Sequence, residues 1–276
     1  MQRQTFGSIT VDAITDGFLS FQFVIEGADM DRYRELGGFE GDIISAPLTT
    51  FIIRTVGRTI LVDTGIGPDL GRLGKMGMTG EVGLLPASLK AIGLHPEAVD
   101  TVVMTHLHSD HIGWNVTEQS TGGFKPTFKN ARYLVNEAEL TVADTVAGKR
   151  DAEKQVHRLV SSGHLHPVSE THEIAPGVRL LPTPGHTPGH VSILIMSGGE
   201  GGVITGDATH HPGELEQPDV IIPVDTDPSL ATASRRMLVE RIEAEGLTVM
   251  GGHFPGSQVG KIIRVESMRR WQWLGG

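Results

Sequence analysis

Short apolar runs separated by turn-forming residues dominate the first quarter of the chain. Residues 8–14 (SITVDAI) and 18–25 (FLSFQFVI) are two strand-like runs on either side of Thr15-Asp16-Gly17, a pattern that predicts a β-hairpin. Residues 48–65 (LTTFIIRTVGRTILVDTG) hold two β-branched runs around Gly57-Arg58 and predict a second hairpin. We therefore expect the amino-terminal part of the chain to form antiparallel β-structure.

Two segments near these hairpins lack a regular pattern. Residues 27–46 mix a short helical piece with glycines, and residues 65–83 carry Leu73, Met76 and Met78 as isolated apolar groups among many glycines. We expect residues 65–83 to form a mobile loop. Both segments are candidates for a subunit contact or for a lid over a binding site.

From residue 84 onward, helical and strand-like segments alternate. The apolar residues Leu230, Ala233, Met237 and Ile242 recur at helical spacing, and Gly246 stops that helix. Because the chain shows no internal repeat and no linker, we expect residues 1–276 to form one α/β domain of layered sheets and helices. The expected helices lie near 86–92, 151–162 and 228–245, and the expected strands cover 101–105, 131–139, 178–183, 191–197, 202–208 and 247–252.

Composition narrows the classes of partner. The 276 residues include 33 Asp and Glu against 23 Lys and Arg, so the formal net charge of −10 argues against nucleic acid and anionic lipid as partners. No apolar run approaches the roughly 20 residues that cross a bilayer, and the first residues lack the apolar run of a secretory leader. We expect a cytoplasmic protein with no membrane partner. Cysteine is absent, so any metal must be held by His, Asp or Glu.

A dense group of metal-ligating residue types follows the expected strand 101–105. His106, His108, Asp110 and His111 lie within six consecutive positions, in the stretch THLHSDHIGW. Side chains 106 and 108 share one face of an extended segment, and Asp110 and His111 fall in the turn that follows. Because ligands usually bind at strand ends in layered α/β folds, this group is a candidate metal site.

Three further residues of the same chemical types stand at later strand ends. His186 lies in TPGHTPGH, Asp207 in GVITGDA and His253 in VMGGHFPG, each beside glycines that permit close backbone approach. A single histidine is usually structural, but four separate strand ends that together contribute seven imidazole or carboxylate groups favour a common site. The pattern predicts a two-metal centre.

The motif HLHSDH resembles the HxHxDH signature of the metallo-β-lactamase superfamily, and LVDTG, TPGHTPGH and TGD occur in the order and context typical of it. The resemblance covers nearly the whole chain. It implies the four-layer αββα sandwich of that superfamily. It also implies one metal on His106, His108 and His186, a second on Asp110, His111 and His253, and Asp207 as the bridge between them.

The resemblance also implies supporting residues and the class of metal. Asp63 would hold the ligand histidines through hydrogen bonds, with an ordinary turn aspartate as the alternative, and His190 would support the site unless it is a packed histidine. Zinc is the first choice for both ions, and iron, manganese or cobalt remain open because His and Asp ligands suit them too. Such a site activates a hydroxide near neutral pH and is built for hydrolysis.

Individual residues and short stretches distinguish branches of the superfamily. Acyl-homoserine-lactone lactonases usually place a tyrosine three residues after the bridging aspartate, where this chain has His210. The stretches GDATHHP, PDVIIPVDTDPSLA and GGHFPG resemble the methyl-parathion-hydrolase-like branch, which includes esterases and lactonases. The resemblance implies a binuclear hydrolase of esters or lactones, with phosphotriesters as further candidate substrates. Asp110 is the candidate proton carrier, and His210 either donates a hydrogen bond to the developing oxyanion or orders its loop.

Alternative functions remain open at this point. A metal-dependent redox or oxygen-binding protein can use the same fold, and so can a thioesterase-type hydrolase, although few residues follow His253 to form the helical domain that such thioesterases usually append. A binding protein with a degenerate site is a third alternative. Trp114, Met76 and Phe254 are candidates for the apolar wall of a substrate pocket, with core packing as the alternative. We expect a small-molecule ester or lactone as partner, and a homodimer, which is common among compact members of the superfamily.

Overall fold

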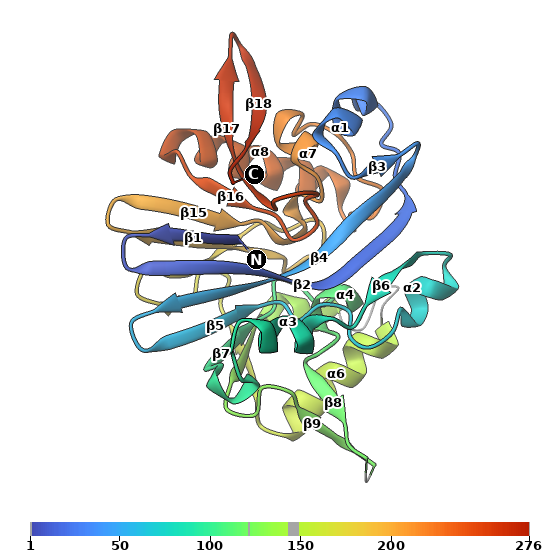
Figure 1. Cartoon of the computed structure of the whole chain (residues 1–276), viewed down its shortest axis with the longest axis vertical. Helices are drawn as coiled ribbons and strands as arrows, with labels where there is room; N and C mark the ends of the chain where they lie inside the picture. The colour runs from blue at the N-terminus through green and yellow to red at the C-terminus, as the bar shows by residue number, and fades with distance from the viewer. Residues whose placement is uncertain (1, 121, 143–148, 276) are drawn as a thin grey trace.

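Two β-sheets packed face to face form the centre of the computed structural model, which describes residues 2–120, 122–142 and 149–275 (Figure 1). The first sheet is mostly antiparallel, but β5, β7, β10 and β11 run parallel to one another. In the order β1-β2-β4-β5-β7-β10-β11, its strands are β1 (Gln2–Phe6), β2 (Ile9–Gln22), β4 (Ile43–Thr55), β5 (Arg58–Val62), β7 (Thr101–Val103), β10 (Arg132–Asn136) and β11 (Leu165–Val168), with β3 (Phe39–Glu40) on β4 and β6 (Thr79–Val82) on β2.

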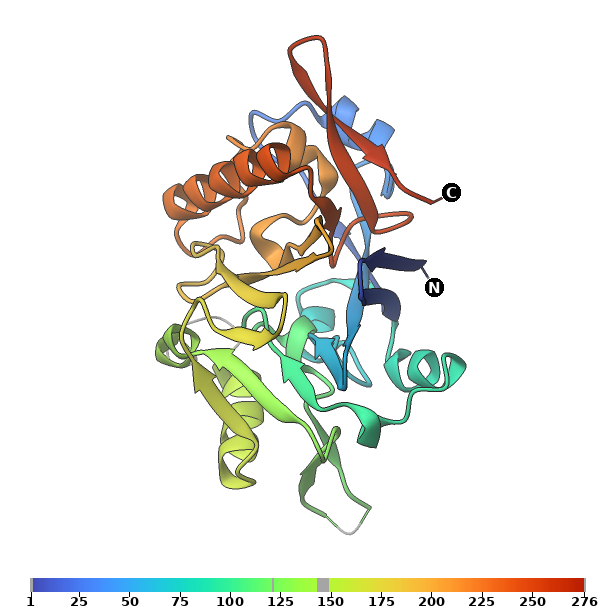
Figure 2. The same cartoon turned by 90° about the vertical axis from the view of Figure 1, so that its left-hand side faces the viewer.

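The second sheet follows the order of the sequence. Among its described residues, β15 and β16 are the one parallel pair. A small separate ribbon is made by β8 (Val116–Glu118) and β9 (Phe124–Pro126). Its strands are β12 (Glu173–Ala175), β13 (Val178–Pro182), β14 (Val191–Ser197), β15 (Glu200–Ile204), β16 (Thr248–Met250), β17 (Val259–Val265) and β18 (Met268–Trp273). The β17–β18 hairpin and the β8–β9 ribbon project from opposite ends of the molecule (Figure 2).

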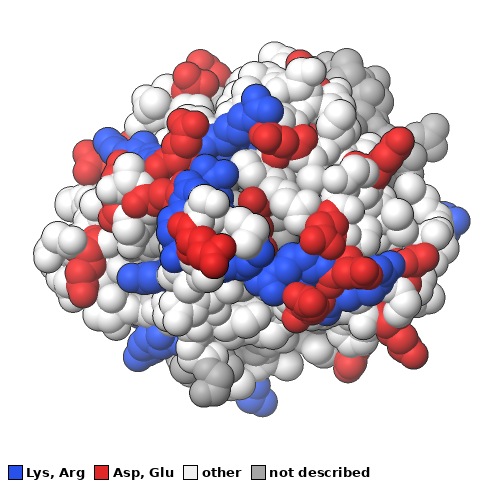
Figure 3. Space-filling model, turned by 90° about the horizontal axis from the view of Figure 1, so that it is seen from above, with Lys and Arg blue, Asp and Glu red and all other residues white. Residues whose placement is uncertain are grey.

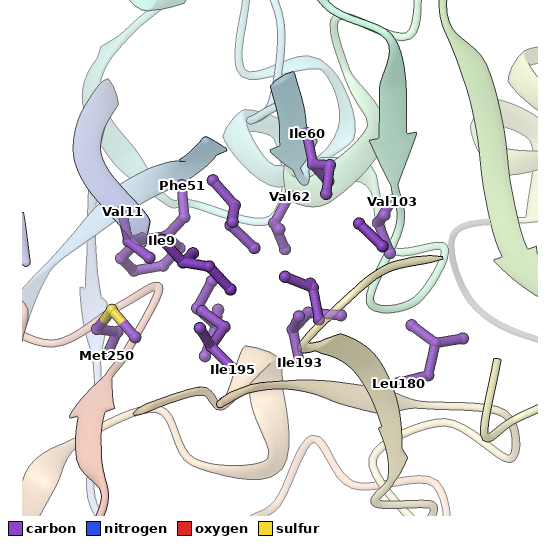
Figure 4. Close-up of a cluster of buried hydrophobic side chains, with 14 of the residues drawn as sticks. Ile9, Val11, Phe51, Ile60, Val62, Val103, Leu180, Ile193, Ile195 and Met250 are labelled. Carbon is purple, nitrogen blue, oxygen red and sulfur yellow. The ribbon is translucent and has the colours of Figure 1, made fainter. Parts of the chain in front are cut away.

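Alternation of side chains along the strands builds the core. Phe51 and Ile53 of β4 point into the space between the sheets, whereas Ile52 points to the opposite face. Ile193 and Ile195 of β14 enter the same space from the second sheet (Figure 4). Since successive residues of a strand face opposite sides and both sides are buried here, these strands are almost continuously apolar.

Helices cover the two outer faces. In Figure 1, α8 lies above the sheets, and α3 and α6 lie below them. Leu238, Val239 and Ile242 of α8 pack on the second sheet, and Leu89 of α3 and Leu159 of α6 pack on the first. The four-layer αββα arrangement implied by the sequence resemblance is therefore confirmed. The helices are α1 (Met30–Leu36), α2 (Gly71–Lys75), α3 (Leu85–Ala91), α4 (Ser109–Ile112), α5 (Glu137–Val142), α6 (Lys149–Ser161), α7 (Pro212–Glu216) and α8 (Pro228–Glu245), with short 3-10 turns η1 (Pro96–Ala98) and η2 (Gly206–Ala208).

The long helix α8 matches its prediction at both ends. Asp227 caps it by accepting a hydrogen bond from the backbone N–H of Leu230 at 3.0 Å, and Pro228 occupies the first turn, where it displaces no helical donor. Gly246 ends the helix in the left-handed conformation, with φ of 64°. The predicted hairpin around Gly57 is also confirmed as β4 and β5.

The predicted hairpin at residues 15–17 is wrong. β2 runs without interruption through these residues, with a β-bulge between Thr15 and Gly17, and it pairs with β1 and β4 on its two sides. Gly17 has φ of 129°, and a Cβ there would overlap the Glu81 carbonyl of β6. The Asp-Gly pair therefore marks a bulge with close strand approach, not a turn.

The predicted mobile loop 65–83 is also wrong. It contains α2 and β6, and β6 pairs antiparallel with the second half of β2. Gly80 allows this pairing, because a Cβ there would overlap the carbonyl of Phe18. Two smaller differences are that the predicted strand 131–139 gives way to α5 after Asn136, and that the β17–β18 hairpin was not predicted.

Charged side chains gather at one end of the molecule. Figure 3 shows a band of Lys and Arg flanked by Asp and Glu on the end face of the molecule. Several of the arginines near this end form ion pairs, such as Arg264 and Arg269 with Glu243. Among the described residues, no helix is both long and apolar enough to cross a membrane.

The packing between the sheets generates a stability prediction. Ile193 is fully buried in that layer, so Ile193→Ala should lower the free energy of unfolding by about 2–5 kcal/mol through lost burial and a residual cavity. Val56→Ala, in the β4–β5 turn at 87% exposure, should change it by less than about 0.5 kcal/mol. Urea unfolding measures both, and equal effects would contradict the assigned core.

Candidate metal centre

The histidine-rich stretch lies where β7 leaves the first sheet. After Thr105 the chain passes through His106 and His108 in extended backbone, and α4 then carries Asp110 and His111. Gly113 ends this stretch against the backbone of Ile66, where a Cβ would overlap the Ile66 carbonyl group. The glycine therefore lets the whole loop pack tightly over the end of the sheet.

The three distant residues meet this stretch at the same end of the two sheets. His186 follows β13, Asp207 lies in η2 directly after β15, and His253 follows β16. Five of the seven predicted side chains are buried, and His108 and Asp110 are partly exposed. Ligating atoms group into two sets, each with its atoms within 4.8 Å of one another: His106, His108, His186 and Asp207 in one, and Asp110, His111 and His253 in the other.

Asp207 lies between the two sets. Its Oδ1 atom is 3.2 Å from His111 Nε2 and 3.3 Å from His253 Nε2. Its Oδ2 atom is 3.3 Å from His186 Nε2 and 3.8 Å from His106 Nε2. Each carboxylate oxygen therefore faces a different set, which is the geometry of a bridging carboxylate.

The remaining distances within the sets are also short. His108 Nδ1 lies 2.9 Å from His186 Nε2, and Asp110 Oδ2 lies 3.7 Å from the Nε2 atoms of both His111 and His253. His106 Nε2 and Asp207 Oδ1 are buried without a hydrogen-bond partner. An unpaired buried polar atom costs about 1–3 kcal/mol. One cation in each set would satisfy these atoms, because His106 belongs to the first set and Asp207 Oδ1 faces the second. The residues therefore fit two divalent ions.

The protonation states of the ligating groups differ between the two sets. Burial opposes the ionised form of Asp207, but the neighbouring His111 and His253 outweigh it and hold the pKa of this carboxyl well below its usual range. Burial also lowers the pKa of His106 and His186, which favours their neutral forms. At His111 and His253 the effect of burial is outweighed by the nearby Asp207, which raises the pKa of both imidazoles, so an ion binding there would displace their protons. Ionised carboxylate and neutral imidazole are the forms that bind metals.

The two predicted supporting residues lie against the cluster. Asp63 Oδ2 accepts a hydrogen bond from His111 Nδ1 at 2.8 Å, and its Oδ1 accepts one from the backbone N–H of Thr105 at 2.8 Å. His190 Nε2 accepts the backbone N–H of Asp207 at 2.9 Å, and burial lowers the pKa of His190 to about 3. Both contacts orient residues of the cluster.

The sequence did not predict several other groups that hydrogen-bond to the histidine loops. His186 Nδ1 donates to Asp225 Oδ1 at 3.1 Å, and His253 Nδ1 donates to the Pro47 carbonyl at 2.8 Å. Glu139 of α5, buried at 1% exposure, accepts the backbone N–H groups of Leu107 at 3.1 Å and Gly189 at 2.8 Å, which ties the two histidine loops together. Neither carboxylate belongs to a local motif, so no sequence signal marked it.

His210 and His211 have different surroundings. His210 Nε2 is 3.4 Å from Asp207 Oδ2, and its ring lies parallel to that of His253 with centroids 6.2 Å apart. His211 stacks on Tyr33 at 4.9 Å, and its Nε2 donates to the Gly37 carbonyl at 3.2 Å. Of the two neighbours, only His210 reaches the cluster.

A pocket of about 920 Å³ opens directly above the cluster. Its floor includes His108, Asp110, His186, Asp207, His210 and His253. Its walls come from residues 19–24, from Ile43, Ile44 and Ala46 of β4, from Leu73 and residues 76–79, and from residues 222–224. These walls are mostly apolar, and the described lining residues include no Lys or Arg. Such a pocket suits a neutral ligand with an apolar chain.

One of the three predicted pocket residues lines this pocket. Met76 does, at 61% exposure. The prediction for Phe254 is wrong, because its ring is fully buried and packs edge-on against Trp271 at 5.4 Å. The prediction for Trp114 is also wrong: its Nε1 donates to Asp16 Oδ1 at 2.8 Å, and its ring packs on the core beneath α4. Both residues directly follow ligand segments but face away from the ligands.

Known proteins resemble this chain in sequence and in fold. Residues 47–253 match the profile described as "Metallo-beta-lactamase superfamily". An "N-acyl homoserine lactonase" of Bacillus sp is 29% identical over 228 residues, which cover 77% of this chain and 83% of that protein. A "Probable metallo-hydrolase" of Mycobacterium tuberculosis is 28% identical over 182 residues, covering 60% of this chain and 57% of that protein.

Solved structures share the fold across the whole chain. The dizinc quorum-quenching lactonase AidC, solved with a homoserine product, superposes with a TM-score of 0.83 at 20% identity and covers 100% of this chain and 97% of its own. The hydrolase AbOPH superposes with a TM-score of 0.80 at 21% identity, covering 99% and 97%.

The surroundings of His211 generate a prediction on pH. Burial lowers the pKa of His211 to about 4, below the usual 6.5. Between these two pH values the imidazole is protonated in the unfolded chain and neutral in the folded chain. This contribution to stability is complete above pH 6.5 and declines as the pH falls toward 4, by up to about 1.4 kcal/mol per pH unit. His211→Gln should therefore flatten the pH dependence of unfolding in that range.

Urea unfolding between pH 7 and pH 4 measures this slope. His95→Gln is the matched control, because His95 is exposed, and its curve should follow that of the unsubstituted protein. Equal slopes for the two variants would show that His211 is not the buried neutral group.

Proposed function

Because the chain belongs to the metallo-beta-lactamase superfamily, we propose that it hydrolyses N-acyl homoserine lactones and related lactones or esters with the help of two divalent metal ions. The sequence relatives named N-acyl homoserine lactonase support the substrate class. The observation that carries the proposal is the bridging position of Asp207 between two ligand sets at the floor of an apolar pocket.

The geometry of the two sets supports a ligand assignment. We propose that His106, His108 and His186 hold one ion, that Asp110, His111 and His253 hold the other, and that Asp207 contributes one oxygen to each. Zinc is the proposed metal, since nitrogen-rich sites suit it and a dizinc lactonase shares the fold. Iron, manganese and cobalt fit the same ligand types.

Two bound divalent ions would polarise a substrate carbonyl and lower the pKa of water toward 7. The chain's own residues supply the remaining functions. Asp110 faces the pocket and is placed to accept a proton, and His210 presents its imidazole beside Asp207, where it can donate a hydrogen bond to a substrate oxygen. The apolar walls exclude water and hold an acyl chain.

Other expectations remain predictions from the sequence. They are one domain over residues 1–276, a cytoplasmic location, a homodimer, and activity on phosphotriesters. The shared core between the two sheets supports the single domain, because it draws side chains from strands along nearly the whole chain.

The bridging role of Asp207 can be tested directly. Asp207→Ala removes one ligand from each proposed ion, so we expect bound metal to fall from two equivalents per chain and lactone hydrolysis to fall more than about 100-fold. Metal analysis and hydrolysis of N-hexanoyl homoserine lactone measure the two effects. Asp31→Ala, at an exposed site on α1, is the control. Unchanged metal content and activity in Asp207→Ala would overturn the assignment.

The apolar pocket predicts a dependence on acyl-chain length. Each methylene that the pocket buries is worth about 0.8 kcal/mol, so kcat/KM should rise up to about fourfold per added methylene. Val224→Glu places a charge on the pocket wall at a residue 58% exposed, and should weaken this rise.

Rates for N-butyryl, N-hexanoyl and N-decanoyl homoserine lactones give the slope. Val56→Glu adds the same charge far along the sequence, at 87% exposure in the β4–β5 turn, and serves as control. The same chain-length slope in both variants would place the acyl chain elsewhere.

A further inference from the structure

A row of buried charged side chains lies directly behind His210. Glu214 of α7, Arg235 of α8 and Asp225 between these helices have side chains no more than 1% exposed. Burying charged groups costs free energy, and pairing repays it only when the geometry is good. The row touches the candidate centre at both ends: at His210 through Glu214, and at His186 through Asp225.

Glu214 contacts His210 through both backbone and ring. Its Oε2 accepts the backbone N–H of His210 at 3.1 Å and lies 3.7 Å from the ring atom Nδ1. With the Nδ1 edge turned toward Glu214, the Nε2 edge points to the cluster, 3.4 Å from Asp207 Oδ2. Glu214 therefore lies beside the Nδ1 edge of the imidazole, and the opposite edge faces the cluster.

Arg235 holds this arrangement from the other side. Its Nε lies 3.6 Å from Glu214 Oε2 and donates to the Ala208 carbonyl at 3.1 Å. Its remaining nitrogens reach the Val220 carbonyl at 2.7 Å and Asp225 Oδ2 at 3.3 Å. The Arg235 guanidinium therefore binds the backbone at Ala208, just after Asp207, and lies between the carboxylates of Glu214 and Asp225.

The bonding of this row is incomplete in one respect. Glu214 Oε1 is buried without a hydrogen-bond partner, and neither ring nitrogen of His210 has one within hydrogen-bonding distance and angle. A buried carboxylate with an unpaired oxygen lowers stability, so packing alone does not account for a glutamate at this position. Glu216 on the same helix shows the contrast, because Arg32 and the backbone N–H of Trp271 bind its two oxygens.

We propose that Glu214 is a positioning residue, which Arg235 holds in place and which orients His210 so that Nε2 meets the substrate oxygen. The inference rests on the proposed lactone hydrolysis, and it assigns to His210 a substrate-facing role that depends on its carboxylate partner. Since misplacing a reacting group by about 1 Å can cost 100-fold in rate, loss of this orientation should appear mainly in kcat.

A double-mutant cycle on Glu214 and His210 tests the proposal. We expect Glu214→Ala and His210→Ala each to lower kcat for N-hexanoyl homoserine lactone about 10- to 100-fold, with KM and metal content little changed. The double variant should be no slower than His210→Ala alone, because both changes remove one function. Glu214→Gln keeps a side-chain oxygen that can accept the backbone N–H of His210. This variant should retain kcat within about threefold of the unsubstituted protein.

Glu216→Gln is the matched control from the same helix. It should lower stability without changing kcat, since Glu216 contacts α1 and β18 and not His210. Additive losses in the cycle, or loss of metal in Glu214→Ala, would show a general structural role and overturn the proposal.

A second readout keeps the proposal separate from the proposed function. The NMR signals of the His210 imidazole, assigned by their absence in His210→Ala, should shift or broaden in Glu214→Ala and stay unchanged in Glu216→Gln. Failure of the unsubstituted protein to hydrolyse lactones would refute the proposed substrate class, and the NMR comparison would still decide whether Glu214 orients His210. Unchanged His210 signals in Glu214→Ala would overturn the proposal whatever the substrate.

Discussion

The buried carboxylate of Asp207 is the group on which the arrangement of the site depends. One carboxylate oxygen faces each of the two sets of side chains. Because these side chains come from the ends of both sheets, the two sheet ends must meet at Asp207. Four of the neighbouring imidazoles have an outer nitrogen bound to the protein: His106 to Thr105, His111 to Asp63, His186 to Asp225 and His253 to the Pro47 carbonyl. The inner nitrogens are left to face the carboxylate, so hydrogen bonds within the protein orient these imidazoles.

The seven cluster residues could be predicted because each follows an apolar strand, and strand ends converge in layered folds. The supporting layer could not be predicted as completely. Asp225 and Glu139 act through contacts with residues about 39 and 50 positions away in sequence, and such contacts have no local pattern. Neighbours of ligands were equally hard to place: Phe254 adjoins His253, yet its ring enters the core on the other side.

The fold was predictable where alternation was strong and both faces of a strand were buried, as in β4 and β14. It was not predictable where glycine serves close approach. At Gly17 and Gly80 a side chain would overlap a carbonyl of the neighbouring strand, so the same residue type that signals a turn marks strand pairing there. Local sequence does not distinguish these two uses of glycine, because the difference lies in a partner strand 59 to 65 residues away.

The bulge in β2 separates a half of the strand that packs in the core from a half that lines the pocket. Before the bulge, Ile9 and Val11 belong to the core between the sheets. After it, residues 19–22 form part of the pocket wall, and β6 pairs with residues 17–20. The part of the strand exposed to substrate is thus separated from the part that supports the fold. Substitutions in the distal half of this strand can therefore reshape the pocket without removing any side chain from the layer between the sheets.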